Sequence, residues 1–243
     1  MEHFGLSKIK LKTISKLKQK KYRLMEGQVV VEGIRTLSQI KDYGIIPLEQ
    51  YRLDSVSSIW DDVPTFTLQE WEMRKICSSE NPQTVAALFS VPRARSVEFR
   101  RAFYLDGIGD PGNLGTIFRL AAAFLIDSIF LSPQCVEVSS PKVIRASLGS
   151  VYQVPFEIMT HSSLNATQAL MVITDSHKGI PLKDFHPVLD ERIIVVLGSE
   201  AHGIAKELRS ATAKKIHIQT SSQIESLNVS VAAGIIAHHL YTG

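Results

Sequence analysis

The pattern of apolar and polar positions changes its period repeatedly along this chain. In the second half, short runs of branched and aromatic residues alternate with longer stretches in which apolar residues recur every three or four positions. The short runs are typical of buried strands, and the longer stretches are typical of helices with one apolar face. From about residue 102 onward, the alternation predicts an α/β fold with a mostly parallel sheet and helices on both faces.

Six apolar runs are expected to form the strands of this second half. They are AFYLD, SIFLS, QVPFEI, MVITD, RIIVVLG and KIHIQ, at residues 102–106, 128–132, 153–158, 171–175, 192–198 and 215–219. Helices are expected at residues 114–125, 141–148, 163–170, 204–211 and 227–241.

The first part of the chain predicts a separate, smaller α/β unit of about 90 residues. Residues 28–32 form an apolar strand pattern, Gly33 a turn, and residues 34–42 a helix. The stretch SVPRARSVEFRR, residues 90–101, contains a proline and four arginines and is interpreted as a linker. We therefore expect one domain over residues 1–95 and a second over residues 96–243.

Residues 7–23 carry eight Lys or Arg and no acidic residue. Ile9, Ile14 and Leu17 can share one face of a helix, with lysines covering the rest. Two interpretations stay open: a solvated helix or loose terminus, and an arm that binds nucleic-acid phosphates by releasing their counterions. The residues expected to contact RNA are Lys18, Lys20, Lys21, Tyr22, Arg23 and Arg35.

Composition excludes several classes of protein. Hydrophobic residues make up 44% of the chain and charged residues 21%, as in ordinary globular proteins. No apolar run reaches the roughly 18–20 residues of a membrane span, and the first residues lack the apolar core of a secretory signal. Cys77 and Cys135 are too few for a zinc cluster or a disulfide framework, so we expect no metal site and a cytoplasmic location.

One glycine-rich loop imitates a dinucleotide-binding motif. Gly107, Gly109 and Gly112 fit G-x-G-x-x-G, and Asp127 lies 20 residues beyond the first glycine. The ribose-binding acid of a dehydrogenase follows the second strand, however, whereas Asp127 precedes it. The loop therefore indicates close backbone approach to a ligand more than it indicates a dehydrogenase.

Three segments carry polar residues at places suited to a ligand. Asn113 is expected to cap a helix that carries Arg119 among apolar neighbours. Glu200 lies in the loop that follows a buried strand, and strand ends of this kind bind ligands in open α/β sheets. Ser226 and Asn228 open the last helix, where more polar residues occur than capping requires.

These segments read N-x-G-x-x-x-R, G-x-E-x-x-G and S-L-N-V-S, in that order. Together they closely resemble the three motifs of the SpoU/TrmH family of RNA ribose 2′-O-methyltransferases, within the SPOUT class. The resemblance covers the chain from about residue 100 to its end. The N-terminal unit is similar to the small ribosomal-protein-like RNA-binding domain that many members carry.

The resemblance implies S-adenosylmethionine as cofactor, a C-terminal trefoil knot and a homodimer with sites near the subunit interface. It implies an RNA substrate, ribosomal RNA more than transfer RNA. It places Arg119, Asn113, Glu200, Ser226 and Asn228 around the reacting ribose. It assigns the cofactor pocket to Thr174, Leu197, Gly198, Gly203, Ile218 and Leu227. Gln219 stands where the family commonly has proline, which predicts a more flexible cofactor loop.

The chemistry leaves the role of Arg119 open. A guanidinium has a pKa above about 12 and is a poor base. A clamp on the neighbouring phosphate that also stabilises the developing alkoxide is therefore favoured, with proton abstraction by Arg119 as the alternative. Two other functions are a catalytically silent RNA-binding protein on the same fold and a nucleotide-dependent dehydrogenase.

Overall fold

The computed structural model describes residues 2–176, 178–188, 191–199, 202–211, 214–221 and 223–242 of the 243-residue chain. The chain forms two compact units. The N-terminal unit consists of Met1–Pro92 together with Glu137–Gln153, and the C-terminal unit consists of Arg93–Val136 and Val154–Gly243. A single cut near residue 95 assigns Glu137–Gln153 to the C-terminal unit, whereas this segment packs with the N-terminal one.

The N-terminal unit is built on a five-stranded sheet with the order β1-β4-β3-β5-β2. β5 is antiparallel to β2 and β3, while β4 is parallel to β1 and β3. The strands are β1 (Glu2–Phe4), β2 (Gln28–Glu32), β3 (Glu49–Arg52), β4 (Thr65–Thr67) and β5 (Val85–Ser90). The helices are α1 (Lys8–Lys16), α2 (Lys20–Glu26), α3 (Ile34–Asp42), α4 (Glu70–Ile76), α6 (Pro141–Ala146) and the 3₁₀ turn η1 (Ser150–Tyr152).

The basic segment folds into two helices, α1 and α2, separated by residues 17–19, and its apolar face differs from the expected one. Ile14 and Leu17 are buried, but Ile9 is 82% exposed, and Leu11 takes its place in the core. Leu11, Ile14 and Leu17 recur at intervals of three and so share one side of the helix. The lysines between them consequently face away from the core.

Two ion pairs fix the segment Glu137–Gln153 to the rest of the N-terminal unit. Arg145 Nη1 lies 2.7 Å from Glu32 Oε1, and Arg23 pairs with Glu137. Glu32 is almost fully buried, so its charge needs such a partner. Gly149 adopts φ +79°, and a Cβ there would lie 2.2 Å from a side-chain carbon of Ile40.

The C-terminal unit contains a seven-stranded sheet with the order β10-β12-β9-β11-β6-β7-β8. Every adjacent pair in it is parallel, which confirms the predicted sheet type. The strands are β6 (Arg101–Asp106), β7 (Ser128–Leu131), β8 (Phe156–Ile158), β9 (Leu170–Thr174), β10 (Ile180–Pro181), β11 (Ile193–Gly198) and β12 (Lys214–His217). The helices are α5 (Pro111–Ala123), α7 (His161–Asn165), α8 (Lys206–Ala211), α9 (Val229–Thr242) and the 3₁₀ turn η2 (Leu182–Asp184).

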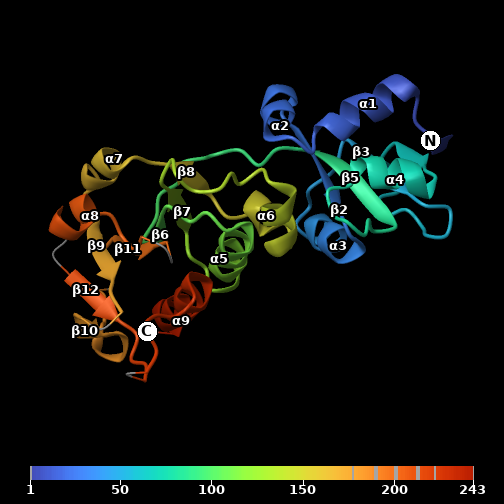
Figure 1. The fold of residues 1–243 in the computed structure, drawn as a ribbon. Coiled ribbons are helices and arrows are strands. Elements are labelled where there is room, and N and C mark those ends of the chain that lie inside the picture. Colours follow the sequence, from blue (N-terminus) through green and yellow to red (C-terminus); the bar gives the residue numbers. More distant parts are fainter. Residues whose placement is uncertain are drawn as a thin grey trace. The chain divides into compact units, whose positions relative to one another are not determined.

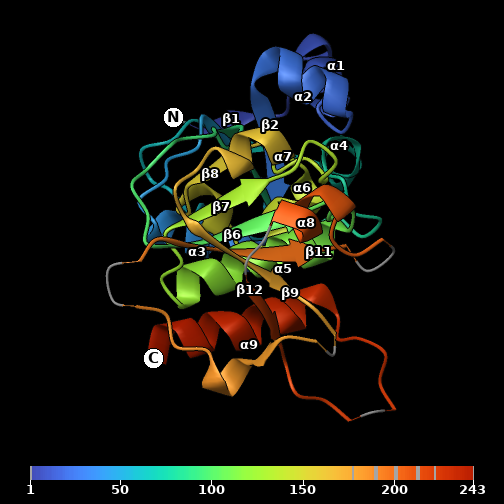
Figure 2. The ribbon, with the colours of Figure 1, turned by 90° about the vertical axis from the view of Figure 1, so that its left-hand side faces the viewer.

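Helices cover both faces of this sheet, as Figures 1 and 2 show. On one face, Leu164 of α7 and Leu208 of α8 pack with inward residues of β6, β9 and β11. On the other face, α5 and α9 lie against each other, and a Cβ on Gly234 would lie only 3.3 Å from Leu120. The strands between the two helical layers are consequently apolar on both sides.

One helix was predicted too long. The pattern suggested a helix over residues 163–170, but α7 ends at Asn165 and β9 begins at Leu170. The Thr167 hydroxyl donates to the carbonyl of Leu164, a bond that closes the helix end. Leu170, the last residue of the expected helix, therefore begins β9 instead.

Within the described ranges, no helix has both the length and the apolar character needed to cross a bilayer. In the same part of the chain, no cluster of three or more His, Cys, Asp or Glu side chains is arranged to hold a metal ion.

Candidate active site

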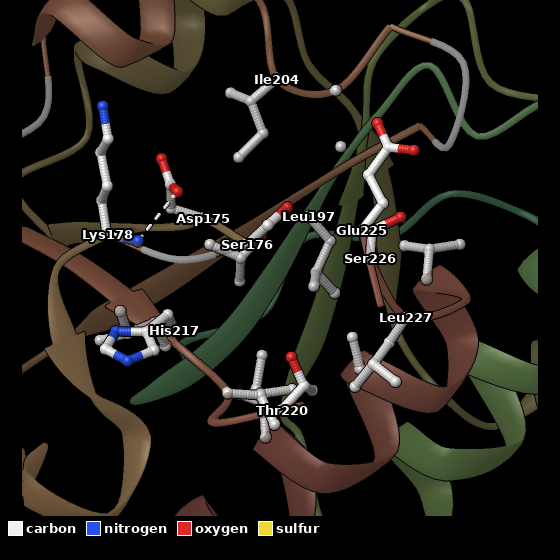
Figure 3. Close-up of a pocket in the computed structure, with 18 of the residues that line it drawn as sticks. Asp175, Ser176, Lys178, Leu197, Ile204, His217, Thr220, Glu225, Ser226 and Leu227 are labelled. Atoms are coloured by element: carbon white, nitrogen blue, oxygen red, sulfur yellow. Dashed lines mark hydrogen bonds between the residues drawn. The ribbon is translucent and has the colours of Figure 1, made fainter. Parts of the chain in front are cut away.

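The carboxyl ends of β12, β9, β11 and β6 meet at one edge of the C-terminal sheet, because these strands are consecutive and parallel. A pocket of about 530 Å³ opens at this edge, against the start of α9 (Figure 3). Its volume lies within the roughly 300–1,000 Å³ typical of small-molecule sites.

All six residues predicted to hold the cofactor line this single pocket. They come from the ends of three strands and from the loops that follow: Thr174, Leu197, Gly198, Gly203, Ile218 and Leu227. The hydroxyl of Thr174 donates to the carbonyl of Val196, 3.0 Å away, and so ties β9 to β11 at the pocket floor. The structure therefore gathers one ligand site from segments that lie far apart in the sequence.

The loop after β11 folds back onto the end of its own strand. The Gly203 N–H donates to the carbonyl of Ser199 over 2.8 Å, and Gly203 adopts φ +65°. A Cβ on Gly198 would lie 2.3 Å from the carbonyl carbon of Gly203, so only glycine fits there. This close return exposes backbone groups along one wall of the pocket.

Polar residues that the sequence analysis did not single out also line the pocket. Figure 3 shows Asp175 and Lys178 at one end and Glu225 at the other. The Lys178 N–H donates to Asp175 Oδ1 over 3.1 Å. Arg209 also lines the pocket, and its Nε donates to the carbonyl of Ile204. The sequence carried a signal for Asp175, because it directly follows the end of β9, where ligands of open sheets bind.

The start of α5 differs from the predicted capping pattern. Asp110, not Asn113, caps the helix, since Asp110 Oδ1 accepts the Asn113 N–H over 2.8 Å. Pro111 at the first helical position favours this earlier start. The side chain of Asn113 is thereby left for another partner: its Oδ1 accepts the amide Nδ2–H of Asn228 over 3.0 Å.

Asn228 is the residue that caps α9. Its Oδ1 accepts the N–H groups of Ser230 and Val231 and the hydroxyl of Ser230. Its Nδ2 reaches Asn113, so the third motif is joined to the first by the side chain that starts the helix. Ser226 was predicted to share the capping role; instead it is exposed and lines the pocket.

Arg119 lies on α5, six residues beyond Asn113, and its side chain is exposed between Phe118 and Leu120. It forms no hydrogen bond or ion pair with any other residue that the structure describes. It is not part of the pocket lining. Its guanidinium is thus available to a ligand that approaches from outside. Glu200 lies outside the described residues.

The glycine loop before α5 is held from the side by the turn that follows β7. Ser132 Oγ accepts the Gly107 N–H, and Cys135 Sγ accepts the Ile108 N–H while donating to the Leu105 carbonyl. Burial raises the pKa of the Cys135 thiol, which keeps it protonated for that donation. Cys77 is also a free, buried thiol, in the N-terminal unit, and burial raises its pKa as well.

Asp127 has a structural role at the opposite edge of the sheet. Its Oδ2 accepts the N–H groups of Arg100 and Arg101, at 2.8 and 2.9 Å, where β6 begins. It is therefore remote from the carboxyl edge, where a ribose-binding acid belongs.

The residues predicted to contact RNA divide into exposed and buried groups. Lys18, Lys20, Lys21 and Arg35 are exposed, and Tyr22 is partly buried with Lys16 Nζ 5.2 Å from its ring centre. Arg23 contradicts the prediction. Its guanidinium is 5% exposed, donates to the carbonyls of Leu17 and Lys18, and pairs with Glu137.

Burial lowers the pKa of Arg23, because desolvation disfavours its charged form. Arg23 therefore positions the turn between α1 and α2 and is not placed to bind phosphate itself.

Residues 100–238 match the model of the SpoU rRNA Methylase family. The chain belongs to this family. Residues 8–87 match a second model, the MRM3-like substrate binding domain. The identification made from the three motifs is confirmed, and the chain has the fold of this family's RNA methyltransferases.

Similar proteins span nearly the whole chain. A Bacillus subtilis protein named 23S rRNA (guanosine(2553)-2′-O)-methyltransferase RlmP is 28% identical over 95% of both chains. A solved structure of a putative TrmH-family RNA methyltransferase from Porphyromonas gingivalis has a TM-score of 0.83, with 28% identity and 98% coverage of both chains. The structure of an AdoMet-bound rRNA methyltransferase from Sinorhizobium meliloti shares the fold. It has 23% identity and a TM-score of 0.81, and the match covers 98% of this chain and 96% of that one.

Proposed function

We propose that this protein transfers a methyl group from S-adenosylmethionine to a ribose 2′-hydroxyl of RNA, with ribosomal RNA as the substrate. The observation that carries the proposal is the pocket itself. Residues of the second and third motifs line it, and the Asn228–Asn113 hydrogen bond joins the third motif to the first. Family membership and the Bacillus relative named for 23S rRNA support the substrate class.

The pocket fits the proposed cofactor on three grounds. Leu197, Ile204 and Ile236 provide apolar walls for an adenosine group. Asp175 and Lys178 provide opposite charges for an amino acid group. The close approach at Gly198 presents backbone N–H and C=O groups that an added Cβ would displace. When bound, S-adenosylmethionine supplies an electrophilic methyl group on its sulfonium.

The residues around the pocket hold the ribose for that transfer. The methyl group would pass to the ribose 2′-oxygen, S-adenosylhomocysteine would be the leaving group, and the hydroxyl proton would pass to solvent water. Asn113 and Asn228 fix the polar wall between α5 and α9. Arg119, which has no partner among the residues that the structure describes, clamps the adjacent phosphate and stabilises the developing alkoxide. Glu200 and Ser226 complete the polar face by family resemblance.

Isothermal calorimetry tests the class of ligand. The wild-type protein should bind S-adenosylmethionine and S-adenosylhomocysteine and should not bind NAD. Mapping of ribose methylations in cells that lack the gene then identifies the nucleotide, as a 2′-O-methyl group missing from one ribosomal RNA position. Binding of NAD without S-adenosylmethionine would favour a dehydrogenase instead, and cofactor binding with no lost methylation would contradict the substrate.

The proposal extends to the chain's finer topology and location. The C-terminal segment from β12 through α9 forms the family's trefoil knot, an exception to the rule that connections do not thread loops. Support comes from the pocket, since residues of the loops after β9, β11 and β12 all line it. The enzyme works in the cytoplasm, where ribosomal RNA is found.

A homodimer is predicted in solution. Three apolar side chains on α9 remain exposed, namely Val231 at 50%, Ile235 at 40% and Tyr241 at 53%. Burying such a helical face against a second copy stabilises a dimer through the hydrophobic effect. Light scattering at micromolar concentration should give twice the mass of the 27.0 kDa chain. An Ile235→Glu variant should shift toward monomer, and a monomeric wild-type protein would contradict the prediction.

We propose that residues 1–95, the N-terminal domain expected from the sequence, contribute affinity for RNA. Replacing Lys18, Lys20 and Lys21 by alanine should weaken RNA binding and make it less dependent on salt, because up to three phosphate contacts are lost. A matched control replaces the exposed Lys183, Lys206 and Lys214 of the C-terminal unit. Filter binding at several salt concentrations measures both affinity and slope. Equal losses in the two triple variants would show a nonspecific effect of net charge.

A further inference from the structure

Asp106 is a buried acid next to the pocket that no motif includes. It is the last residue of β6, 7% exposed, and pairs in the sheet with Gly198, the last residue of β11. A carboxylate in such surroundings requires hydrogen-bond donors. Asp106 has two: Oδ2 accepts the Ala205 N–H at 2.8 Å, and Oδ1 lies 2.9 Å from His161 Nε2.

The bonds of Asp106 hold both ends of the loop that follows β11. Its backbone carbonyl accepts the N–H of Ser199, at the first position of the loop, over 3.1 Å. Its carboxylate accepts the N–H of Ala205, at the last position. Between these two points, Ser199, Gly203 and Ile204 line the pocket. Asp106 thus holds the loop at Ser199, where it leaves β11, and at Ala205, directly before α8.

We infer that Asp106 is a positioning residue for the cofactor loop, acting through Ser199 and Ala205 and not by touching the ligand. This inference rests on the proposed function, because it assigns S-adenosylmethionine to the pocket. A charged acceptor forms a stronger and shorter bond to a backbone N–H than a neutral one does. Loss of the carboxylate frees the return end of the loop and so loosens the wall that Gly203 and Ile204 provide.

His161 completes the arrangement on the other side of the carboxylate. It begins α7, and its ring packs edge-on against Tyr104 at a centroid distance of 6.1 Å. The hydroxyl of Tyr104 donates to the Met159 carbonyl just before the helix. These two contacts attach the start of α7 to β6, and His161 holds the Asp106 carboxylate in the orientation that reaches Ala205.

A second aspartate, Asp127, which directly precedes β7, provides a matched control. Asp127 also accepts two hydrogen bonds, both from backbone N–H groups, but at the amino end of β6, away from the pocket. Asp106→Ala and Asp127→Ala should both lower the melting temperature. Only Asp106→Ala should weaken S-adenosylmethionine binding, by roughly tenfold or more, which is the scale of one charge-assisted hydrogen bond. Calorimetry and the KM for S-adenosylmethionine measure this, with kcat at saturating cofactor changing much less.

Amide hydrogen exchange gives a second readout that does not depend on activity. In the Asp106 variant, amides of residues 202–205 should exchange faster, while those of residues 100–102 should change only in the Asp127 variant. If Asp106→Ala does not fold, Asp106→Asn takes its place, because it keeps the shape and an acceptor but loses the charge. The Asp106→Asn variant should show the same weaker cofactor binding and faster loop exchange, each to a smaller extent.

The outcomes separate the two claims. A wild-type protein that does not bind S-adenosylmethionine overturns the proposed function and this inference with it. A wild-type protein that binds, with folded Asp106 and Asp127 variants of equal cofactor affinity, overturns the inference and leaves the proposed function standing. Weaker binding in the Asp106 variants alone, together with faster exchange of the loop, supports the inference.

Discussion

Replacing Arg119 by alanine is expected to leave the protein folded and able to bind S-adenosylmethionine while lowering methyl transfer by about a hundredfold or more, the usual scale for loss of an electrostatic stabiliser. The structure supports this separation of folding from chemistry. The Arg119 side chain is exposed on α5 and has no partner among the described residues, so its removal breaks no internal bond. It also lies outside the pocket lining, so cofactor affinity should change little.

Two further variants separate the charge of Arg119 from its packing. Arg119→Met keeps an apolar stem beside Phe118 and Leu120 but removes the charge, and it should be as slow as the alanine variant. Arg119→Lys keeps a charge but not the planar fork, and it should recover little of the rate. Single-turnover rates at saturating cofactor, with melting temperatures measured in parallel, make the comparison. A folded Arg119→Ala enzyme with the wild-type rate would remove Arg119 from the mechanism.

The sheet of the C-terminal unit could be predicted from the sequence because its strands are buried on both faces. Runs such as residues 193–197 are continuously apolar and are recognised without any tertiary information. The three motifs could also be predicted to converge, because two of them follow parallel strands and carboxyl ends share one edge. The six residues that the family resemblance assigns to the cofactor line one pocket because these strand ends lie side by side.

Details of capping could not be read from residue type alone. Asn113 and Asp110 are both good capping residues, and the helix start was decided by Pro111, which favours the first helical position. Asn228 does cap, but its second bond to Asn113 spans 115 residues of sequence. No local pattern reports such a contact. The same limit applies to Asp106, whose partners Ala205 and His161 lie far along the chain.

The basic segment shows why charge alone did not identify contact residues. Arg23 belongs to the same run as Lys18, Lys20 and Lys21, but it is buried and paired with Glu137, which is 114 residues away. The pairing depends on the segment Glu137–Gln153 packing in the N-terminal unit. Dividing the sequence into two domains at one linker cannot predict that a segment beyond this linker packs in the N-terminal unit.

Replacing Gly198 by alanine is expected to displace the loop that forms one wall of the pocket. The added Cβ would lie 2.3 Å from the Gly203 carbonyl carbon and 2.5 Å from the Ile204 nitrogen. Both are backbone atoms, so no side-chain rotation relieves the contact, and the loop itself has to move. Overpacking of this kind costs about 1–3 kcal/mol of stability, and the displaced residues are those that line the pocket.

Cofactor affinity should therefore fall by roughly tenfold to a hundredfold in Gly198→Ala, with a lower melting temperature. Gly109→Ala is the matched control, since it adds the same methyl group to a nearby glycine whose Cβ would meet nothing within 4 Å. Both changes reduce the entropy of the unfolded chain in the same way, so a difference between them reports the contact at Gly198. Calorimetry with S-adenosylmethionine provides the measurement. Equal affinities in the two variants would mean that the loop moves aside without cost, and that backbone contact at Gly198 does not hold the cofactor.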